Sequence, residues 1–187
     1  YLDETYRIEA GTSGYYVMSA VVIESGQRDF VRDGIKGIVG GNYWHTTDAL
    51  QTEGGRRTTC ELLDYLNDPE GREVCLIAHQ RRLAENDLRG EEARAACLKS
   101  LLGHLNGSGS PMGQVDLFVL EKRLNQSMVN RDAKTKDEAV QAGLVSKQAR
   151  LFQISPADEA LLWLPDLVCS AYRQQVTGRR RDLFDRV

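Results

Sequence analysis

Two segments of the chain are apolar on both faces of an extended backbone, and they restrict the fold more than any other feature. Tyr15–Ile23 is rich in valine, isoleucine and tyrosine, and Val115–Glu121 is apolar up to a charged run, Glu121–Arg123. Strands of this kind are typical of the centre of a sheet that is covered on both faces. Leu2–Thr5 reads as the end of a further strand, which we expect to pair antiparallel with Tyr15–Ile23.

Amphipathic helices are predicted as the cover for this sheet. Apolar residues recur at helical spacing in Asp29–Val39, which Gly40-Gly41 closes, and in Glu91–Leu105. Thr58 stands three residues before Glu61, a capping-box spacing, and a leucine-rich helical face follows. Helices with one apolar face are expected to pack against a sheet rather than to stand alone.

A last helix is expected to open at Ser155 and to run to about Val176, with Pro165 kinking or dividing it. Alternating helices and strands predict an α/β fold, a mixed sheet of about five strands flanked by helices. The chain is interpreted as a single domain over 1–187, with 179–187 a frayed basic tail. The other expected elements are strands at Asn42–Thr47, Glu73–His79 and Arg150–Ile154, partly helical sequence over 125–147 and a loop at Gly107–Gly113.

Composition excludes several classes of protein. The 187 residues are 41% hydrophobic and 27% charged, an ordinary globular balance. No apolar run approaches the ~20 residues that span a bilayer, so no membrane partner is expected. The four cysteines have no paired spacing and read as reduced core thiols, which points to the cytoplasm. The net charge of −3 argues against a nucleic-acid partner only if the acids lie outside a metal site.

Carboxylates in apolar settings are the chemically unusual residues. Asp3 and Glu4 lie in the first strand, Glu121 ends the most hydrophobic strand, and Asp166 lies on an apolar face of the last helix. Burying a carboxylate there is costly unless a cation compensates it. Acids from strand ends and a packing helix can converge in space, which suits Mg²⁺ or Mn²⁺ acting on a phosphoryl group.

Each acid also has a purely structural interpretation. Glu121 could be a solvated strand end paired with Lys122 or Arg123, and Asp166 could cap a helix that restarts after Pro165. Glu61 is better explained as a capping acid than as a ligand. Two further acids are better explained as surface residues, Asp48 and Asp64.

The order of these segments resembles the ribonuclease H-like superfamily, and within it a bacterial family of unknown function marked by an N-terminal Asp-Glu-Ser motif. The resemblance covers about residues 1–175 and implies a five-stranded mixed sheet flanked by helices. It also implies that the first and fourth strands are parallel neighbours, whose acids meet one from a late helix around two metal ions. The matching segments are Tyr1–Thr5, Tyr15–Ile23, Tyr43–Asp48, Val115–Glu121 and Leu164–Tyr172.

The resemblance assigns roles residue by residue. Asp3, Glu121 and Asp166 match the three metal-binding acids, and three residues match weaker motif positions, Glu4, His45 and Asp158. The chain departs from the pattern at three places. Thr5 replaces the motif serine, Glu121 stands where the pattern has Asp, and Trp163-Leu-Pro165-Asp166 replaces Gln-x-Ala-Asp.

His45 is the histidine with a candidate chemical role. It could act as a proton shuttle or phosphate contact. The structural alternative, which we favour on the sequence alone, is packing against Trp44 and Tyr43. The other two histidines, His79 and His104, are interpreted as a core or edge residue and a residue on the polar flank of a helix.

The first functional hypothesis is a metal-dependent nuclease that hydrolyses phosphodiesters. Asp3, Glu4, Glu121 and Asp166 would hold Mg²⁺ or Mn²⁺, and His45 would assist. The alternative is a non-catalytic module of the same fold that binds nucleic acid or a protein, its metal site decayed, as the Trp163 and Pro165 departures suggest. A third hypothesis is a hydrolase of small phosphorylated metabolites. Whether DNA or RNA is the partner stays open, as do a protein partner and a homo-oligomer.

Overall fold

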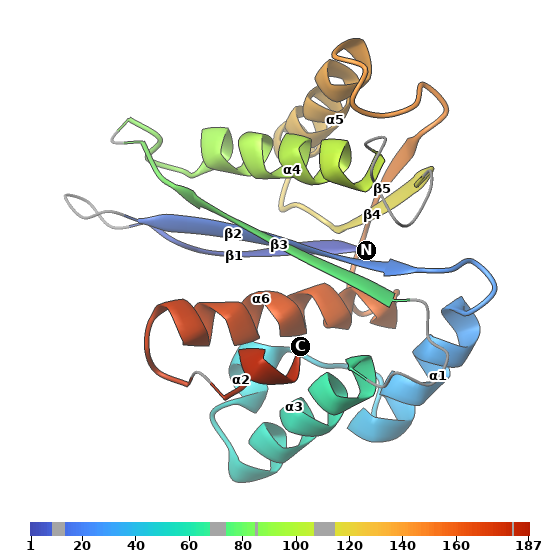
Figure 1. Cartoon of the computed structure of the whole chain (residues 1–187), viewed down its shortest axis with the longest axis vertical. Helices are drawn as coiled ribbons and strands as arrows, with labels where there is room; N and C mark the ends of the chain where they lie inside the picture. Colours follow the sequence, from blue (N-terminus) through green and yellow to red (C-terminus); the bar gives the residue numbers. More distant parts are fainter. Residues whose placement is uncertain (9–13, 68–73, 85, 107–114, 181) are drawn as a thin grey trace.

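One mixed sheet organises the protein. The structure is a computed structural model that describes residues 1–8, 14–67, 74–84, 86–106, 115–180 and 182–187. The strands are β1 (Leu2–Arg7), β2 (Tyr15–Ile23), β3 (Val74–Arg82), β4 (Leu117–Glu121) and β5 (Arg150–Ile154). They lie in the order β3-β2-β1-β4-β5 (Figure 1). β2 pairs antiparallel with both β1 and β3, whereas β1–β4 and β4–β5 are parallel, so β1 is the central strand.

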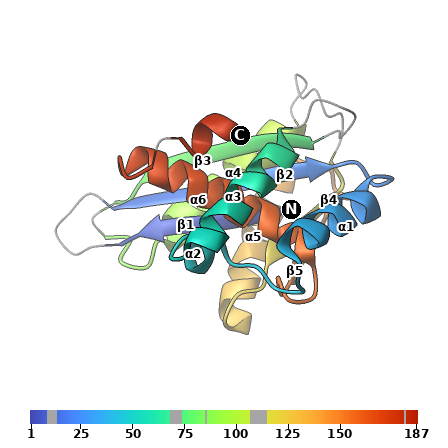
Figure 2. The same ribbon diagram turned by 90° about the horizontal axis from the view of Figure 1, so that it is seen from below.

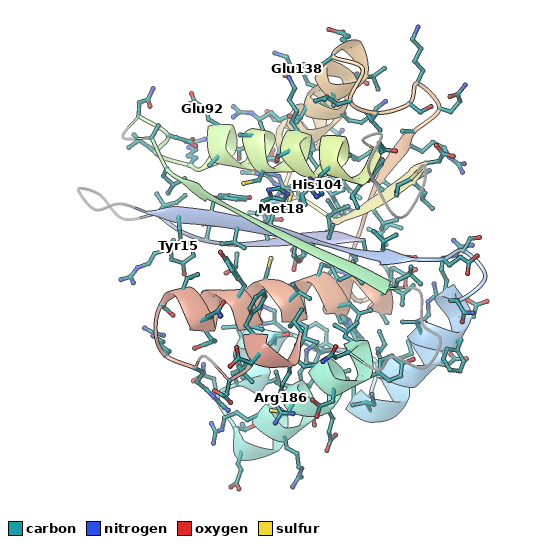
Figure 3. The ribbon with its side chains drawn as sticks, in the orientation of Figure 1. Tyr15, Met18, Glu92, His104, Glu138 and Arg186 are labelled. Atoms are coloured by element: carbon teal, nitrogen blue, oxygen red, sulfur yellow. The ribbon has the colours of Figure 1, made fainter. Side chains whose placement is uncertain are left out.

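Helices cover both faces of the sheet. α4 (Glu91–Asn106) and α5 (Gln126–Gln141) lie on one side, and the other helices lie on the opposite side (Figures 1 and 2). Each side has its own hydrophobic core, and Met18 of β2 lies in the one beneath α4 (Figure 3). The helices of the second side are α1 (Arg28–Val39), α2 (Thr46–Ala49), α3 (Glu53–Leu66) and α6 (Trp163–Val176). The predicted α/β class, a mixed sheet flanked by helices, is confirmed.

Most elements lie where their sequence patterns place them. β1 and β2 are antiparallel neighbours, as expected. α1 ends at Val39 because Gly40 takes a left-handed conformation, with φ of 66°, that glycine adopts without strain. α4 carries Leu98, Leu101 and Leu105 on its buried stripe. β5 has the predicted bounds, and the polar region 125–147 contains the full helix α5.

The prediction of a strand at Asn42–Thr47 is wrong. No residue of this segment pairs with the sheet, and Thr46 begins the short helix α2. Trp44 is buried in the core beneath α6, where its indole N–H donates to the Thr46 hydroxyl at 3.0 Å. Trp44 is therefore buried by a layer of helices, without a strand, whereas Tyr43 is exposed.

α3 begins five residues before the predicted Thr58. Its N-cap is Thr52, whose hydroxyl accepts the N–H of Gly55 at 3.0 Å. Gly55 lies against α2, so closely that a Cβ atom would come 2.1 Å from the carbonyl oxygen of Ala49. Gly55 thus permits close packing of α2 and α3, and neither Gly54 nor Gly55 ends the helix.

Pro165 neither kinks nor divides the last helix. A 3-10 turn, Ala160–Leu162, precedes α6, and Pro165 lies in the first turn of α6. A proline in the first turn loses no helical hydrogen bond. The predicted start at Ser155 is wrong, because residues 155–158 form a turn before these helices.

The segment after α6 is packed where a frayed tail was expected. Leu183 is fully buried, the Phe184 ring contacts Tyr172 edge to face, and Arg186 pairs with Asp64.

The predicted loop at Gly107–Gly113 lies outside the described residues. Within the described part of the chain, no helix has the length and apolar character needed to cross a membrane. Three cysteines are free thiols, Cys60, Cys97 and Cys169.

Candidate active site

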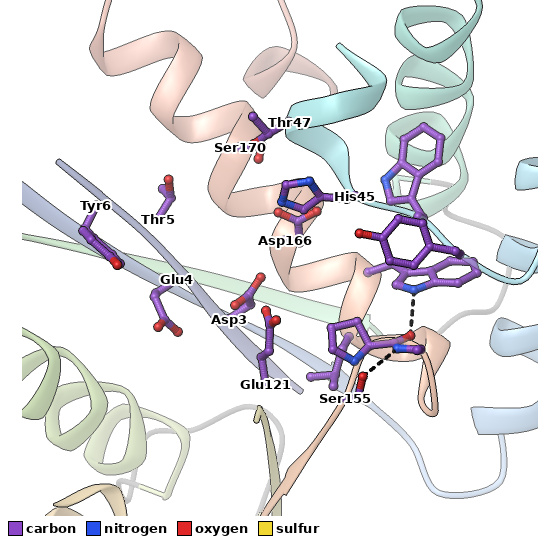
Figure 4. A pocket seen from close by; sticks show the side chains of 16 residues that line it. Asp3, Glu4, Thr5, Tyr6, His45, Thr47, Glu121, Ser155, Asp166 and Ser170 are labelled. Carbon is purple, nitrogen blue, oxygen red and sulfur yellow. Dashed lines mark hydrogen bonds between the residues drawn. The ribbon is translucent and has the colours of Figure 1, made fainter. Parts of the chain in front are cut away.

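Two acids from neighbouring strands meet under α6. The parallel register pairs Leu2 with Leu120, so the next residues, Asp3 and Glu121, are also neighbours. Leu2 and Leu120 belong to the core under α4. Because side chains alternate along a strand, Asp3 and Glu121 face the opposite side of the sheet, which α6 covers. Figure 4 shows their carboxyl groups close together.

The Asp3–Glu121 pair carries unfavourable negative charge. Asp3 is only 6% exposed, and burial, followed by the charges of Glu4, Asp166 and Glu121, raises its pKa well above the usual range. Burial also raises the pKa of Glu121, although a hydrogen bond with Asp3 acts in the opposite direction. Two carboxyl groups in hydrogen-bond contact require a proton or a cation to compensate them.

Asp166 is the third acid of this group. It lies in the first turn of α6, and its Oδ2 accepts the backbone N–H of Thr46 at 2.8 Å. Its charge raises the pKa of both Asp3 and Glu121, which places the three acids within electrostatic reach of one another. α2 therefore orients Asp166 through a backbone donor at its N-terminus.

Hydrogen bonds hold α6 against β1 and β2 next to these acids. The Ser19 hydroxyl of β2 donates to the carbonyl of Pro165 at 2.8 Å. The Cys169 thiol lies 3.4 Å from the backbone carbonyl of Asp3 in β1. Burial and the nearby acids raise the pKa of this thiol, so it stays protonated and serves as a donor, not as a nucleophile.

Glu4 faces the other side of the sheet. It forms an ion pair with Arg94 of α4, a side chain that is only 2% exposed. Arg94 also donates two hydrogen bonds of 2.8 Å to Asp132 and one of 3.1 Å to the hydroxyl of Tyr16. Unlike Asp3, Glu4 is therefore compensated by a buried cation. Glu4 and Asp3 nevertheless line the same cavity, which is described below.

His45 lies at the rim of the site, as the N-cap residue of α2, and it lines the pocket. Its side chain is 45% exposed, its Nδ1 lies 2.8 Å from Oδ2 of Asp48, and its charge lowers the pKa of Glu121. The sequence interpretation of His45 as a strand residue is wrong, because α2 begins at the next residue. The other acidic candidates do not line the pocket, namely Asp158, Glu61 and Asp64.

A cavity of about 450 Å³ is lined by Asp3, Glu4, His45, Glu121 and Asp166, among other residues (Figure 4). We call this cavity the carboxylate pocket and define it by Asp3, Glu121 and Asp166. The described residues of its lining include four acids and neither a lysine nor an arginine. The donor set consists of oxygen ligands, which suits a hard divalent cation. As the side chains stand, no group of three or more His, Cys, Asp or Glu among the described residues could hold a metal ion.

Sequence reasoning missed two partners of the acids. Arg94 is buried with Leu98, Leu101 and Leu105 on the apolar stripe of α4, and an arginine in phase with that stripe is the signal that predicts a buried charge pair. The Thr46 N–H has no sequence signal, since every residue except proline supplies a backbone donor.

We compared the chain with protein-family models, with curated proteins and with solved structures, and none of them matches. The functional argument therefore depends on the geometry and chemistry of the site.

Proposed function

We propose that the protein is a nuclease with a ribonuclease H-like fold that hydrolyses phosphodiester bonds with Mg²⁺ or Mn²⁺. The observation that carries the proposal is the contact between Asp3 and Glu121 beside Asp166, in a pocket whose described lining has no lysine or arginine. Such a cluster of acids costs folding free energy and is best explained by a cation that binds there.

The strand order supports the proposed fold. β1 and β4 are parallel neighbours at the centre of the sheet, and α6 crosses β1 and β2. The acids come from β1, β4 and α6, the three elements that the family resemblance implies.

Asp3 and Glu121 would hold the ion, with Asp166 as the third acid. When bound, a divalent cation neutralises charge on a phosphate and lowers the pKa of water. The Thr46 N–H keeps the Asp166 carboxylate oriented toward the pocket. His45 would exchange a proton with the substrate through Nε2, because Asp48 already occupies its Nδ1.

A non-catalytic module with a decayed metal site is the second candidate. One observation favours it: no group of three or more potential ligands in the described residues could hold a metal ion as arranged. The hydrogen bond from Thr46 to Asp166 also occupies one carboxylate oxygen. This candidate predicts no binding of Mn²⁺ at millimolar concentration.

Two measurements test the proposal. Labelled DNA, RNA, hybrid and duplex substrates are incubated with Mg²⁺ or Mn²⁺, and calorimetry measures Mn²⁺ binding. Asp3→Asn and Glu121→Gln should each reduce cleavage by about 10²–10³-fold, as loss of a charge-stabilising group does. Asp33→Asn, an exposed acid on α1 outside the pocket, is the matched control and should cleave normally.

The outcomes separate the candidates. Full cleavage by Asp3→Asn overturns the metal assignment. Absence of both Mn²⁺ binding and cleavage in the wild-type protein favours the non-catalytic module. Hydrolysis of nucleotides without cleavage of any polymer identifies a hydrolase of small phosphorylated metabolites.

A further inference from the structure

A second cavity adjoins the carboxylate pocket and differs from it in charge. It has a volume of about 260 Å³, and Tyr6 and Thr47 line both cavities. Three arginines line the second cavity, Arg7, Arg173 and Arg179, and none of its described lining residues is an aspartate or glutamate. We call this cavity the arginine groove. The electrostatic character thus changes from acidic to basic across the Tyr6–Thr47 boundary.

Arg173 lies at this boundary in a defined position. It belongs to the last turn of α6, the helix that carries Asp166, and its guanidinium donates to the Thr47 hydroxyl at 3.0 Å. Thr47 belongs to α2, next to the Thr46 N–H that holds Asp166. The same two helices therefore position a carboxylate in one cavity and an arginine in the other. Arginine binds phosphate with paired hydrogen bonds, whereas an acidic pocket requires a cation to accept one.

Tyr6 lines both cavities, and its ring lies on the α4 side of β1, the side that Glu4 also faces. It lies three residues after Asp3 on β1, and 54% of it is exposed. Its ring stacks on Tyr16 with the centroids 5.4 Å apart and the planes 6° from parallel. Tyr16 is buried and hydrogen-bonded to Arg94, so the Tyr6 ring rests on a fixed support. Exposed aromatic rings of this kind stack with unpaired bases.

We propose that the arginine groove binds the backbone of a single-stranded polynucleotide whose neighbouring phosphate lies in the carboxylate pocket, while a base stacks on Tyr6. This proposal rests on the proposed function, because it extends the same site to a substrate class. Two phosphate sites next to an aromatic platform match a nucleic acid strand. An acidic peptide would use the arginines but would gain little from the platform. Only an unpaired base reaches such a ring, so a single strand is preferred over a duplex.

The test measures binding without cleavage. Anisotropy of a fluorescein-labelled oligothymidylate is recorded in EDTA at several salt concentrations, with wild-type protein and variants. Arg173→Gln and Arg179→Gln should each weaken binding and reduce the slope of log affinity against log salt by about 0.7. Arg57→Gln removes the same charge from an exposed site on α3 outside both cavities, and it should leave the slope unchanged.

Variants of Tyr6 test the platform. Tyr6→Leu should weaken binding on the order of tenfold to a hundredfold, whereas Tyr6→Phe, which keeps the ring, should bind like the wild type. Unchanged affinity in both arginine variants overturns the groove. Equal affinity for a duplex, or tighter binding of polyglutamate that is insensitive to Tyr6→Leu, overturns the single-strand assignment.

The two proposals can fail separately. Oligonucleotide binding that depends on the groove, without any metal-dependent cleavage, overturns the nuclease and leaves the groove in place. Cleavage that is insensitive to Arg173→Gln and Arg179→Gln overturns the groove and leaves the nuclease.

Discussion

At the scale of single residues, the adjacent acids Asp3 and Glu4 on β1 lie in opposite electrostatic environments. Asp3 is buried next to Glu121 and raises the electrostatic cost of the folded state. Glu4 points the other way and pairs with Arg94. Strand alternation alone separates the acid that pairs with a buried arginine from the acid that lies beside another carboxyl group.

Removing the Asp3 charge should stabilise the metal-free protein. Asp3→Asn keeps the size of the side chain and abolishes the repulsion from Glu121 and Asp166. We expect the free energy of unfolding at neutral pH in EDTA to rise by about 1–3 kcal/mol, the range that an uncompensated buried polar group costs. Urea unfolding measures it, with Asp33→Asn as the control.

Added Mn²⁺ should reverse the order of stability of the wild-type protein and Asp3→Asn. It should raise the melting temperature of the wild-type protein, because a ligand that binds only the folded state stabilises it, and have little effect on Asp3→Asn. A lower stability of Asp3→Asn in EDTA would contradict the repulsion described for Asp3.

At the scale of elements, α2 matters more for the site than its length suggests. It supplies the Thr46 N–H to Asp166 and carries His45 at its N-terminus. α3 fixes its position, because Gly55 packs directly on the Ala49 carbonyl.

Substitutions in the glycine pair should therefore have opposite effects. Gly55→Ala should destabilise the protein by about 1–3 kcal/mol, because its methyl group overlaps backbone atoms of Ala49. Gly54→Ala, which meets nothing within 4 Å, should stabilise α3 by about 0.5–1 kcal/mol. Thermal unfolding compares the two variants. Gly55→Ala should also weaken Mn²⁺ binding, since α2 must move; equal stability of both variants would refute the close packing.

An ion pair between α1 and the 3-10 turn before α6 should make stability depend on pH. Arg32 donates to both carboxylate oxygens of Glu159, at 3.0 and 2.9 Å. Burial alone would raise the pKa of Glu159, but the hydrogen bonds from Arg32 and from the N–H of Leu161 lower it below its ordinary value of 4.5. An acid with a lowered pKa adds stability above its ordinary pKa, and this stability is lost as the pH falls through the folded value.

Glu159→Gln should thus cost about 1 kcal/mol at pH 7, and the difference from wild type should shrink below pH 4.5. Chemical unfolding at several pH values measures it. Asp29→Asn is a matched control, because Asp29 pairs with the same Arg32 but its side chain is 94% exposed. A constant difference across this pH range would assign the effect to packing, not to charge.

At the scale of the whole molecule, periodicity was sufficient to predict the layers and the mixed sheet. Hydrophobic patterns report which faces are buried, so β2, β4, α1 and α4 were recognisable from the sequence. Patterns do not report what buries a segment, and for this reason the Trp44 region was mistaken for a strand. Close contacts such as that of Gly55 with Ala49 depend on how two helices pack, which hydrophobic periodicity does not record.

The candidate site was predictable in part. Asp3, Glu121 and Asp166 stood out as acids in apolar settings, and the structure brings them together. The pairing of Glu4 with Arg94 and the arginine groove depend on which sheet face and which helix ends meet, and these are properties of tertiary structure.

The three acids of the carboxylate pocket are also synthesised at different times. Of these acids Asp3 is synthesised first, Glu121 follows much later, and Asp166 is made only after all five strands of the sheet. Domains are synthesised from the N-terminus, so a nascent chain holds one acid, then two, before α6 can dock. A chain interrupted before Asp166 lacks both the third acid and the helix that carries Arg173. The carboxylate pocket is therefore complete only once α6 has been made.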